Sequence, residues 1–194
     1  NPDGKLNKVA ENVWNEYQAS NKDGKIGCQL IFSDIGTPGA DKDFTVYQYL
    51  KEALIQYGIP EEEIAFIHDA KTDAQRDVLF KEMRTGKKKV LIGSTDKCGT
   101  GVNVQTHLVA LHHVDCPWKP SSIEQREGRG IRQGNENDEI AVYRYVTKST
   151  FDAYNWSLVE NKQRFISQVT TSKAVSRTCE DIDEATLSYA EIKA

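Results

Sequence analysis

The sequence has few cysteines, no long apolar run and no excess of positive charge. Its four cysteines, Cys28, Cys98, Cys116 and Cys179, include no C-x-x-C pair. Neither a disulfide framework nor a zinc knuckle is therefore predicted, and we expect reduced thiols. No apolar stretch approaches the roughly 20 residues that a membrane helix needs, and residues 1–30 hold no signal-peptide core. We expect a cytoplasmic protein without a membrane partner.

The charge balance limits how the chain can bind nucleic acid. The formal net charge is −4, from 25 Lys and Arg against 29 Asp and Glu. The whole surface has no basic footprint, so any nucleic-acid binding must come from a local patch. With 194 residues, 38% apolar and 28% charged, the composition is that of one globular domain, with or without a terminal extension, and it excludes disorder.

Short apolar runs alternate with helical patterns between Gly27 and Val146. This alternation predicts an α/β fold, in which helices on both faces cover an open, mainly parallel sheet. Most runs are too short for helices, and several are apolar on both faces, as buried parallel strands are. The predicted strands are residues 28–32, 64–67, 89–93, 108–112 and 140–146.

Apolar spacing and capping patterns predict the helices. The stripe over residues 47–57 stops at Gly58, and Thr72-x-x-Gln75 forms a capping box for a helix that ends at Gly86. Ser149-x-x-Asp152 resembles a further cap. It precedes a long helical pattern, which we expect to pack back on the sheet.

The pattern divides the chain into three parts. Residues 1–25 form an amphipathic N-terminal helical extension, and residues 26–169 form the α/β domain. Residues 170–194, which include the acidic run at 180–184, form a C-terminal tail or short helix.

Polar side chains follow the predicted strands at the points where the strands end. They are Ser33-Asp34, His68-Asp69, Ser94-Thr95-Asp96 and Asp115-Cys116. Ligands gather beyond the carboxyl ends of parallel strands, because loops and helix N-termini converge there. We expect the functional site at this edge of the sheet.

The segment over residues 125–135 is rich in arginine and glycine. In a continuous helix, Gln125, Arg129 and Arg132 would share one face at i, i+4 and i+7. Two guanidinium groups at this spacing suit a polyphosphate. Gly128 and Gly130 cost roughly 1 kcal/mol each relative to alanine in a helix, which indicates close approach of another backbone or a ligand. On spacing alone, a solvated basic helix face is the alternative.

A second glycine-rich segment follows the strand over residues 89–93. Its turn, Gly99-x-Gly101, can bring backbone amides close to an anion such as a phosphate. It lacks the third glycine of a dinucleotide fingerprint and the Gly-Lys-Ser/Thr of a Walker A loop. A plain structural loop is the alternative.

Three other candidates have weaker support. His112-His113-x-Asp115-Cys116 suggests a metal site, but neighbouring strand residues point to opposite faces of the sheet. Cys98 and Cys116 have no base partner for a nucleophilic role, so we expect packing thiols. Residues 87–89 form either a phosphate-contacting lysine patch or a solvated run.

The motifs together resemble the second RecA-like lobe of superfamily-2 helicases and translocases. The resemblance is to remodelling-type motors and to the helicase portions of phage and plasmid methylase–helicase fusion proteins, and it covers residues 26–169. Lys97-Cys98 replaces the small residues usual in remodelling-type motors, so the fusion proteins are the nearer match. The matching segments, in order, are residues 29–33 (motif IV), 66–86, 94–104 (motif V), 115–120, 125–134 (motif VI) and 142–150.

The resemblance implies a role for each matching position. Arg132 corresponds to the arginine finger and Arg129 to its neighbour, both reaching the γ-phosphate of ATP. The positions implied to line the ATP cleft are Gln125, Gly101 and Asn103. The positions implied to contact the nucleic-acid backbone are Ser33, Ser94 and Thr95.

The sequence lacks the motifs of the first motor lobe. It has no phosphate-binding Gly-Lys-Thr loop and no D-E-x-H or D-E-A-D box. The resemblance therefore implies that ATP, Mg²⁺ and the hydrolytic water are held mainly by a first RecA-like lobe absent from this chain. We expect one lobe of an ATP-dependent DNA helicase that is inactive alone. RNA is the alternative nucleic acid, and a methylase domain of the same parent protein is a further candidate partner. The alternatives are a catalytically inactive lobe that docks nucleic acid or protein, and a non-motor enzyme on the same sheet.

Overall fold

The computed structural model describes residues 4–39, 45–98, 103–128, 130, 133–148 and 150–170, with side chains to residue 167. Its helices are α1 (Lys5–Ser20), α2 (Val46–Tyr57), α3 (Asp73–Arg84), α4 (Thr95–Cys98), α5 (Pro120–Glu127) and α6 (Phe151–Thr170). Its strands are β1 (Cys28–Phe32), β2 (Ile64–Phe66), β3 (Val90–Gly93), β4 (Leu108–His113) and β5 (Ala141–Arg144). Three short 3-10 turns are η1 (Glu61–Glu63), η2 (Ile67–Asp69) and η3 (Gln105–His107).

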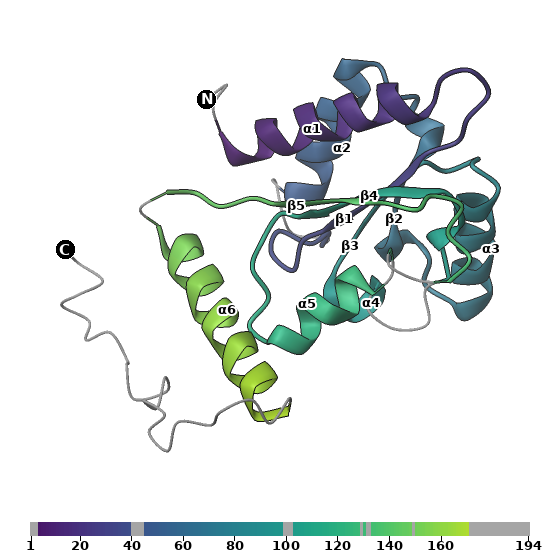
Figure 1. Ribbon diagram of the computed structural model, residues 1–194. Helices are drawn as coiled ribbons and strands as arrows, with labels where there is room; N and C mark the ends of the chain where they lie inside the picture. The colour runs from purple at the N-terminus through teal and green to yellow at the C-terminus, as the bar shows by residue number, and fades with distance from the viewer. Residues whose placement is uncertain are drawn as a thin grey trace.

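The five strands form one open sheet in the order β2-β3-β1-β4-β5 (Figure 1). Every neighbouring pair is parallel, and Leu30 at the centre of the sheet aligns with Leu91 on one side and Leu111 on the other. The predicted fold class is confirmed. The strand predicted over residues 140–146 is shorter than expected, since β5 covers Ala141–Arg144.

Alternate strand residues face two different helix layers. Leu30 and Leu91 belong to a buried cluster that includes Phe80 of α3. Ile31 and Ile92 belong to a second cluster, formed with α1 and α2 on the other face. Figure 1 shows α1 and α2 on one side of the sheet and α4 and α5 on the other. Both faces of the central strands are covered, which explains their near-continuous apolar sequence.

Helix α1 forms within the predicted N-terminal extension and packs into the second cluster. Val9, Ala10 and Val13 are fully buried. The Val13 carbonyl accepts a hydrogen bond from the Gln29 side chain of β1 at 2.9 Å. This part of the extension over residues 1–25 therefore contributes to the core of the domain.

Two predicted helix boundaries are confirmed. The Thr72 side chain accepts from the Gln75 N–H, and the Gln75 side chain accepts from the Thr72 N–H, at the start of α3. Helix α2 ends at Gly58, whose φ of 116° lies in the left-handed region that favours glycine. Ser149, in the third predicted cap, lies outside the described residues.

Helix α6 packs mainly on α5. Trp156 and Val159 form a small buried cluster with Ile123 of α5. The edge of the Trp156 ring also meets His113 at the end of β4, with centroids 6.0 Å apart. The long helix therefore contacts the sheet, as predicted, through the Trp156–His113 contact. Residues 171–194, in the predicted tail, lie outside the described residues.

Helix α5 ends at Glu127, so the described residues do not form the continuous helix that would place Gln125, Arg129 and Arg132 on one face. Gly128 caps the helix, and the Gly130 N–H donates to the Glu127 carbonyl at 2.9 Å in a turn. Arg129 and Arg132 lie outside the described residues. None of the described helices is both long and apolar enough to span a bilayer.

Gly130 lies where apolar side chains of the core come close to the backbone. A Cβ added there would lie 2.2 Å from Ile140 Cδ1 and 3.2 Å from Leu108 Cδ2. The close approach predicted from the glycine is therefore found, but side chains of the protein itself make it.

Candidate functional site

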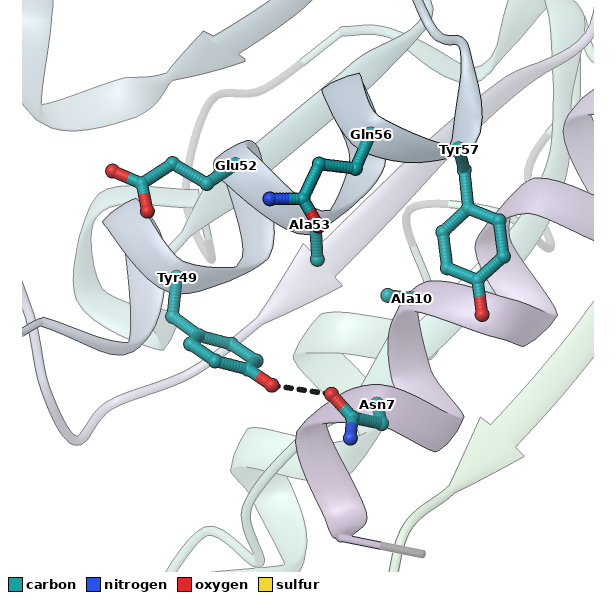
Figure 2. Close-up of a pocket in the computed structure, with 7 residues that line it drawn as sticks. All are labelled: Asn7, Ala10, Tyr49, Glu52, Ala53, Gln56 and Tyr57. Carbon is teal, nitrogen blue, oxygen red and sulfur yellow. Dashed lines mark hydrogen bonds between the residues drawn. The ribbon is translucent and has the colours of Figure 1, made fainter. Parts of the chain in front are cut away.

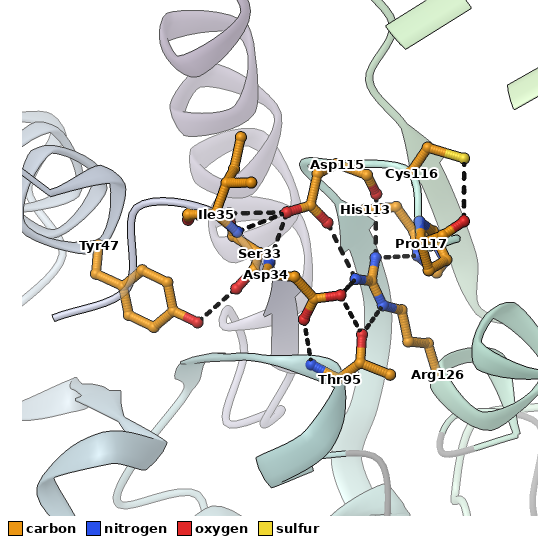
Figure 3. Close-up of polar contacts among 10 residues, drawn as sticks. All are labelled: Ser33, Asp34, Ile35, Tyr47, Thr95, His113, Asp115, Cys116, Pro117 and Arg126. Carbon is orange, nitrogen blue, oxygen red and sulfur yellow. Dashed lines mark hydrogen bonds and ion pairs between the residues drawn. The ribbon is translucent and has the colours of Figure 1, made fainter. Parts of the chain in front are cut away.

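The carboxyl edge of the sheet brings together polar side chains from the segments that follow three strands. Asp34 follows β1, Thr95 follows β3, and Asp115 follows β4. All three bond to Arg126 of α5 (Figure 3). Parallel strands end at one edge of a sheet, so loops distant in sequence meet there. We call Asp34, Thr95, His113, Asp115 and Arg126 the Arg126 cluster.

Arg126 is fully buried and uses every N–H of its guanidinium group. Nε donates to Thr95 Oγ1 at 2.8 Å. Nη1 donates to the Asp115 carbonyl at 3.1 Å and to His113 Nδ1 at 3.3 Å. Nη2 donates to the carboxylates of Asp34 at 2.8 Å and Asp115 at 3.0 Å. Since a guanidinium group has five donors, Arg126 has none left for a further ligand.

The two aspartates join these segments to one another. Asp115 Oδ2 accepts from the backbone N–H groups of Asp34 at 2.5 Å and Ile35 at 3.0 Å, and it lies 3.3 Å from the Ser33 hydroxyl. Asp34 accepts from the Thr95 N–H at 2.6 Å and the Thr95 hydroxyl at 2.7 Å. Asp115 is buried, whereas the Asp34 side chain is 39% exposed. The three segments thus form one hydrogen-bonded unit.

His113 is a neutral member of the cluster. Because Arg126 can only donate, His113 Nδ1 accepts, and the proton of the neutral ring is on Nε2, 3.4 Å from Glu127 Oε1. Burial lowers the pKa of His113; nearby Glu127 opposes this effect, and the Arg126 charge adds to it. The ring also stacks on Phe32, with centroids 5.9 Å apart.

Glu127 ties the end of α5 to β5 and, through Arg144, to α6. Its carboxylate accepts from Arg144 at 2.8 Å. The contact with His113, together with the bond to Arg144, lowers the pKa of Glu127 to about 2 against the opposing effect of burial. Arg144 also lies 5.3 Å from the centroid of the Trp156 ring. Arg126 and Glu127 therefore anchor α5 immediately before residues 128–134.

The described residues after Arg132 are anchored as well. Asn135 donates to the carbonyl oxygens of Leu108 at 3.0 Å and Gly130 at 3.2 Å. Gln105 donates to the Gln133 carbonyl at 3.4 Å. The chain is thus held before Arg129 and after Arg132.

The residues predicted to meet ATP fall on different parts of the structure. Arg129, Arg132 and Gly101 lie outside the described residues. Gln125 is exposed on α5, and Asn103 is exposed beside α3, where its carbonyl accepts from Arg84 at 2.8 Å. Neither side chain belongs to the Arg126 cluster, and their roles stay predictions.

The three residues predicted to contact nucleic acid lie in or beside the cluster. Ser33 is fully buried, and its hydroxyl is shared between the Ile35 carbonyl at 2.9 Å and Asp115 at 3.3 Å. The Thr95 hydroxyl donates to Asp34 and accepts from Arg126. A phosphate contact by either hydroxyl would replace an internal bond.

Ser94 differs from its two partners. Its residue is 9% exposed, and its hydroxyl has no hydrogen-bond partner in the described part of the chain. Of the three hydroxyls, only that of Ser94 could bond a phosphate without first breaking a bond of the cluster.

Sequence analysis missed Arg126 as the centre of the site. The polar residues after strands indicated Asp34 and Asp115. The helical spacing of Ile123 and Arg126, both buried on α5, was a signal that Arg126 faces inward. The pairing itself has no sequence signal, because Asp34 and Arg126 are 92 positions apart.

The described residues hold no group of three or more His, Cys, Asp or Glu side chains arranged for a metal ion. As predicted, His112 and His113 face opposite sides of the sheet, since His112 bonds to Gln29 and Tyr145 rather than to the cluster. The carboxylates of Asp34 and Asp115 already accept N–H and O–H donors, so they do not fit Mg²⁺ as placed here.

Other predicted candidates have structural roles. Burial raises the pKa of Cys116 to about 12, so it is a thiol at neutral pH, and Cys98 is buried in the cluster that contains Leu30. In the lysine run, Lys87 pairs with Glu82 at 2.6 Å and Lys89 with Glu63 at 2.9 Å. Lys87 is exposed, which favours the solvated-run alternative for this residue, whereas the Lys89 side chain is 17% exposed and lies 5.4 Å from the centroid of the Tyr17 ring.

A groove of about 440 Å³ lies between α1 and α2, away from the predicted site residues (Figure 2). Ala10 and Ala53 leave space between the helices, and Tyr49 of α2 donates to Asn7 of α1. It contains none of the positions predicted to bind ATP or nucleic acid.

The open parallel sheet with polar strand ends is a RecA-like fold. Residues 7–134 match the family described as the helicase conserved C-terminal domain. The chain belongs to this family.

Named relatives are consistent with that membership. The chain is 32% identical over 91 residues to Defense against restriction protein B of Escherichia phage P1, a match that covers 47% of this chain and 4% of that protein. It is 35% identical over 92 residues to the uncharacterized ATP-dependent helicase YqhH of Bacillus subtilis, a match that covers 46% of this chain and 16% of that protein. The solved structure of the C-terminal part of the Fun30 ATPase domain superposes with a TM-score of 0.64 at 18% sequence identity. The match covers 80% of this chain and 45% of that chain. The chain thus spans a small part of both curated relatives.

Proposed function

We propose that this chain is the second motor lobe of an ATP-dependent, superfamily-2 DNA helicase or translocase. A first RecA-like lobe of the parent protein holds ATP, and Arg129 and Arg132 reach the γ-phosphate from this lobe. Family membership and the similarity to proteins named as helicases support the proposal.

The observation that carries the proposal is the anchoring of the chain around the two arginines. Arg126, three positions before Arg129, is bound to the ends of β1, β3 and β4. Gln133, next to Arg132, is held through its carbonyl by Gln105. Cations that stabilise a transition state act best when the protein fixes them in advance, because no reorganisation is then needed during the reaction.

In the proposed mechanism, ATP binding closes the gap between the two lobes. Arg129 and Arg132 then stabilise the charge that spreads over the phosphoryl oxygens during transfer, while Gln125, Gly101 and Asn103 line the same cleft. Hydrolysis and product release reopen the gap. Mg²⁺, assigned to the first lobe, neutralises phosphate charge when it is bound.

Nucleic-acid binding is assigned to the loops after β1 and β3. Ser94 contacts a backbone phosphate directly, and Ser33 and Thr95 support the same contact. Phosphate contacts position a strand without reading its sequence and weaken as salt concentration rises. Repeated closing and opening of the lobes would then move this grip along the strand.

Substitution of Arg132 in the full-length parent protein tests the proposal. Arg132→Ala should lower the rate of ATP hydrolysis by about three orders of magnitude, because an arginine finger supplies transition-state charge. Affinity for single-stranded DNA should change little, since Arg132 contacts ATP and not the strand. A phosphate-release assay and fluorescence anisotropy measure the two effects, with RNA of the same sequence as a second ligand.

Arg164→Ala is the matched control, because Arg164 is exposed on α6 and should leave both quantities unchanged. Wild-type turnover in the Arg132→Ala protein would remove the finger assignment. A wild-type parent that binds nucleic acid without hydrolysing ATP would instead support the inactive docking lobe. The reading frame of the parent gives a further test. A Gly-Lys-Thr loop there would support the presence of the first motor lobe, and a methylase motif would support a methylase domain as a further partner.

A further inference from the structure

We infer that Arg126 is a positioning residue that couples nucleic-acid contact at the ends of β1 and β3 to the segment that carries Arg129 and Arg132. The inference rests on the proposed function and deepens it. It assigns a role to a residue that touches neither ATP nor nucleic acid.

The hydrogen bonds of Arg126 exclude direct ligand binding as its role. All five N–H donors go to protein acceptors, which Thr95, His113, Asp34 and Asp115 provide. The side chain has no exposed surface. Arg126 would have to break a bond of the cluster before it could reach a phosphate.

Arg126 instead connects the two parts of the proposed site. Its acceptors come from the loops that hold Ser33, Ser94 and Thr95, the proposed nucleic-acid contacts. Arg126 itself belongs to α5, which ends directly before the segment proposed to reach ATP. The guanidinium group of Arg126 therefore connects the segments proposed to contact nucleic acid to the helix that precedes the segment proposed to reach ATP.

The cluster should move as one body rather than come apart. Two carboxylates and one guanidinium leave it with a net charge of −1, since His113 is neutral. Loss of the Arg126 contacts would leave the buried Asp115 without its cation, and a buried charge that loses its partner is strongly unfavourable. A displacement of Thr95, at the start of α4, when a nucleic-acid strand binds is therefore passed to α5 instead of being absorbed between the two helices.

The test uses Arg126→Lys in the full-length parent protein. Lysine keeps the positive charge but cannot make five hydrogen bonds in the geometry of a guanidinium group. Asp34→Asn is the second variant. Because the Asp34 side chain is 39% exposed, the Asp34→Asn protein should fold even if the Arg126→Lys protein does not. Arg164→Lys, on the exposed surface of α6, is the control.

The quantities measured are the basal and the DNA-stimulated rates of ATP hydrolysis, the affinity for single-stranded DNA and the thermal midpoint. We expect the ratio of stimulated to basal rate to fall by about tenfold, within the range of known coupling between sites. The basal rate should fall less than the stimulated rate, and DNA affinity should stay within about threefold of wild type, because no ligand contact is removed. The control should retain the full ratio.

An unchanged ratio in the folded variants would overturn the inference. A proportional fall of both rates would overturn it as well, because that result indicates only a less stable lobe. These results differ from failure of the proposed function: if Arg132→Ala still hydrolyses ATP, the function fails, whereas an inactive Arg132→Ala with an unchanged ratio in Arg126→Lys refutes the coupling role alone.

Discussion

His112 and His113 are adjacent on β4 and belong to different hydrogen-bond networks on the two faces of the sheet. His112 lies 2.8 Å from Gln29 Oε1 and 2.8 Å from the Tyr145 hydroxyl. Because the Gln29 amide already donates to the Val13 carbonyl, its oxygen accepts from His112 Nε2, and Tyr145 donates to Nδ1. Burial, with a smaller effect of His113, lowers the pKa of His112 to about 3. The neutral ring thus connects β4 to β1 and to Tyr145, the residue after β5.

The two buried histidines predict how stability depends on pH. The unfolded chain takes up protons near the ordinary histidine pKa of 6.5, whereas the folded chain resists protonation to lower pH. Lowering the pH from about 7 to about 5 should therefore reduce the free energy of unfolding, by up to about 1.4 kcal/mol per pH unit for each histidine. Below the ordinary Glu127 pKa of 4.5, protonation of that carboxylate in the unfolded chain adds a loss in the same direction.

Urea denaturation of the purified chain at a series of pH values measures this dependence. His112→Gln keeps a hydrogen-bond donor and an acceptor but has no titrating ring. Its free energy of unfolding should therefore fall less steeply between pH 7 and pH 5, because the variant takes up about one proton fewer on unfolding. Identical slopes for the two chains would contradict the buried, neutral His112.

At the scale of elements, the short α5 and the turn after it determine where the motif VI segment lies. The helix is held by Arg126 and Glu127 and ends where Gly130 meets the core. Asn135 then bonds to the start of β4. The described residues on either side of the segment are therefore held near opposite ends of β4, Arg126 at His113 and Asn135 at Leu108.

Substitution of Gly130 tests this packing. The added methyl group of Gly130→Ala would approach Ile140 Cδ1 to 2.2 Å, and such overpacking should lower the free energy of unfolding by about 1 to 3 kcal/mol. Ile140→Val removes the clashing Cδ1, so the double variant should be more stable than the sum of the two single effects predicts. Urea denaturation of the four chains measures the coupling. Strict additivity would show that Ile140 does not limit the space at Gly130.

At the scale of the whole molecule, the chain offers one side of a proposed nucleotide site. Its candidate arginines are present, but it has no phosphate-binding Gly-Lys-Thr loop. Two acidic side chains at the carboxyl edge, Asp34 and Asp115, are bound to Arg126, and the described residues hold no group of acidic, His or Cys side chains arranged for a metal ion. A separate lobe is therefore needed for catalysis in the proposed mechanism.

This division of labour predicts that the purified chain alone hydrolyses ATP at a negligible rate. In the proposed mechanism the first lobe holds ATP and Mg²⁺ for the most part, so without it no phosphate is aligned with the two arginines. Phosphate release by the wild-type chain should equal that of the Arg132→Ala chain. A clear rate that Arg132→Ala removes would show that one lobe suffices, and would overturn the two-lobe mechanism.

Much of the fold follows from local sequence patterns. Apolar runs located all five strands, and Thr72-x-x-Gln75 and Gly58 marked helix boundaries correctly, because capping and left-handed turns depend on neighbouring residues. Arginine spacing alone could not decide whether a helix continues past Gly128; in the structure α5 ends at Glu127, and the Gly130 N–H bonds to the Glu127 carbonyl in a turn.

The sequence by itself determined the α/β alternation, the order of the motifs and the edge of the sheet where polar residues collect, since these depend on periodicity and on residue types close together in the chain. Only the tertiary structure decided which polar groups pair. Asp34, Thr95 and Asp115 follow three different strands, and all of them reach Arg126 because β1 lies between β3 and β4 in the sheet. Strand order is set by packing over the whole domain, so the identity of the buried cation at the site could be known only after folding.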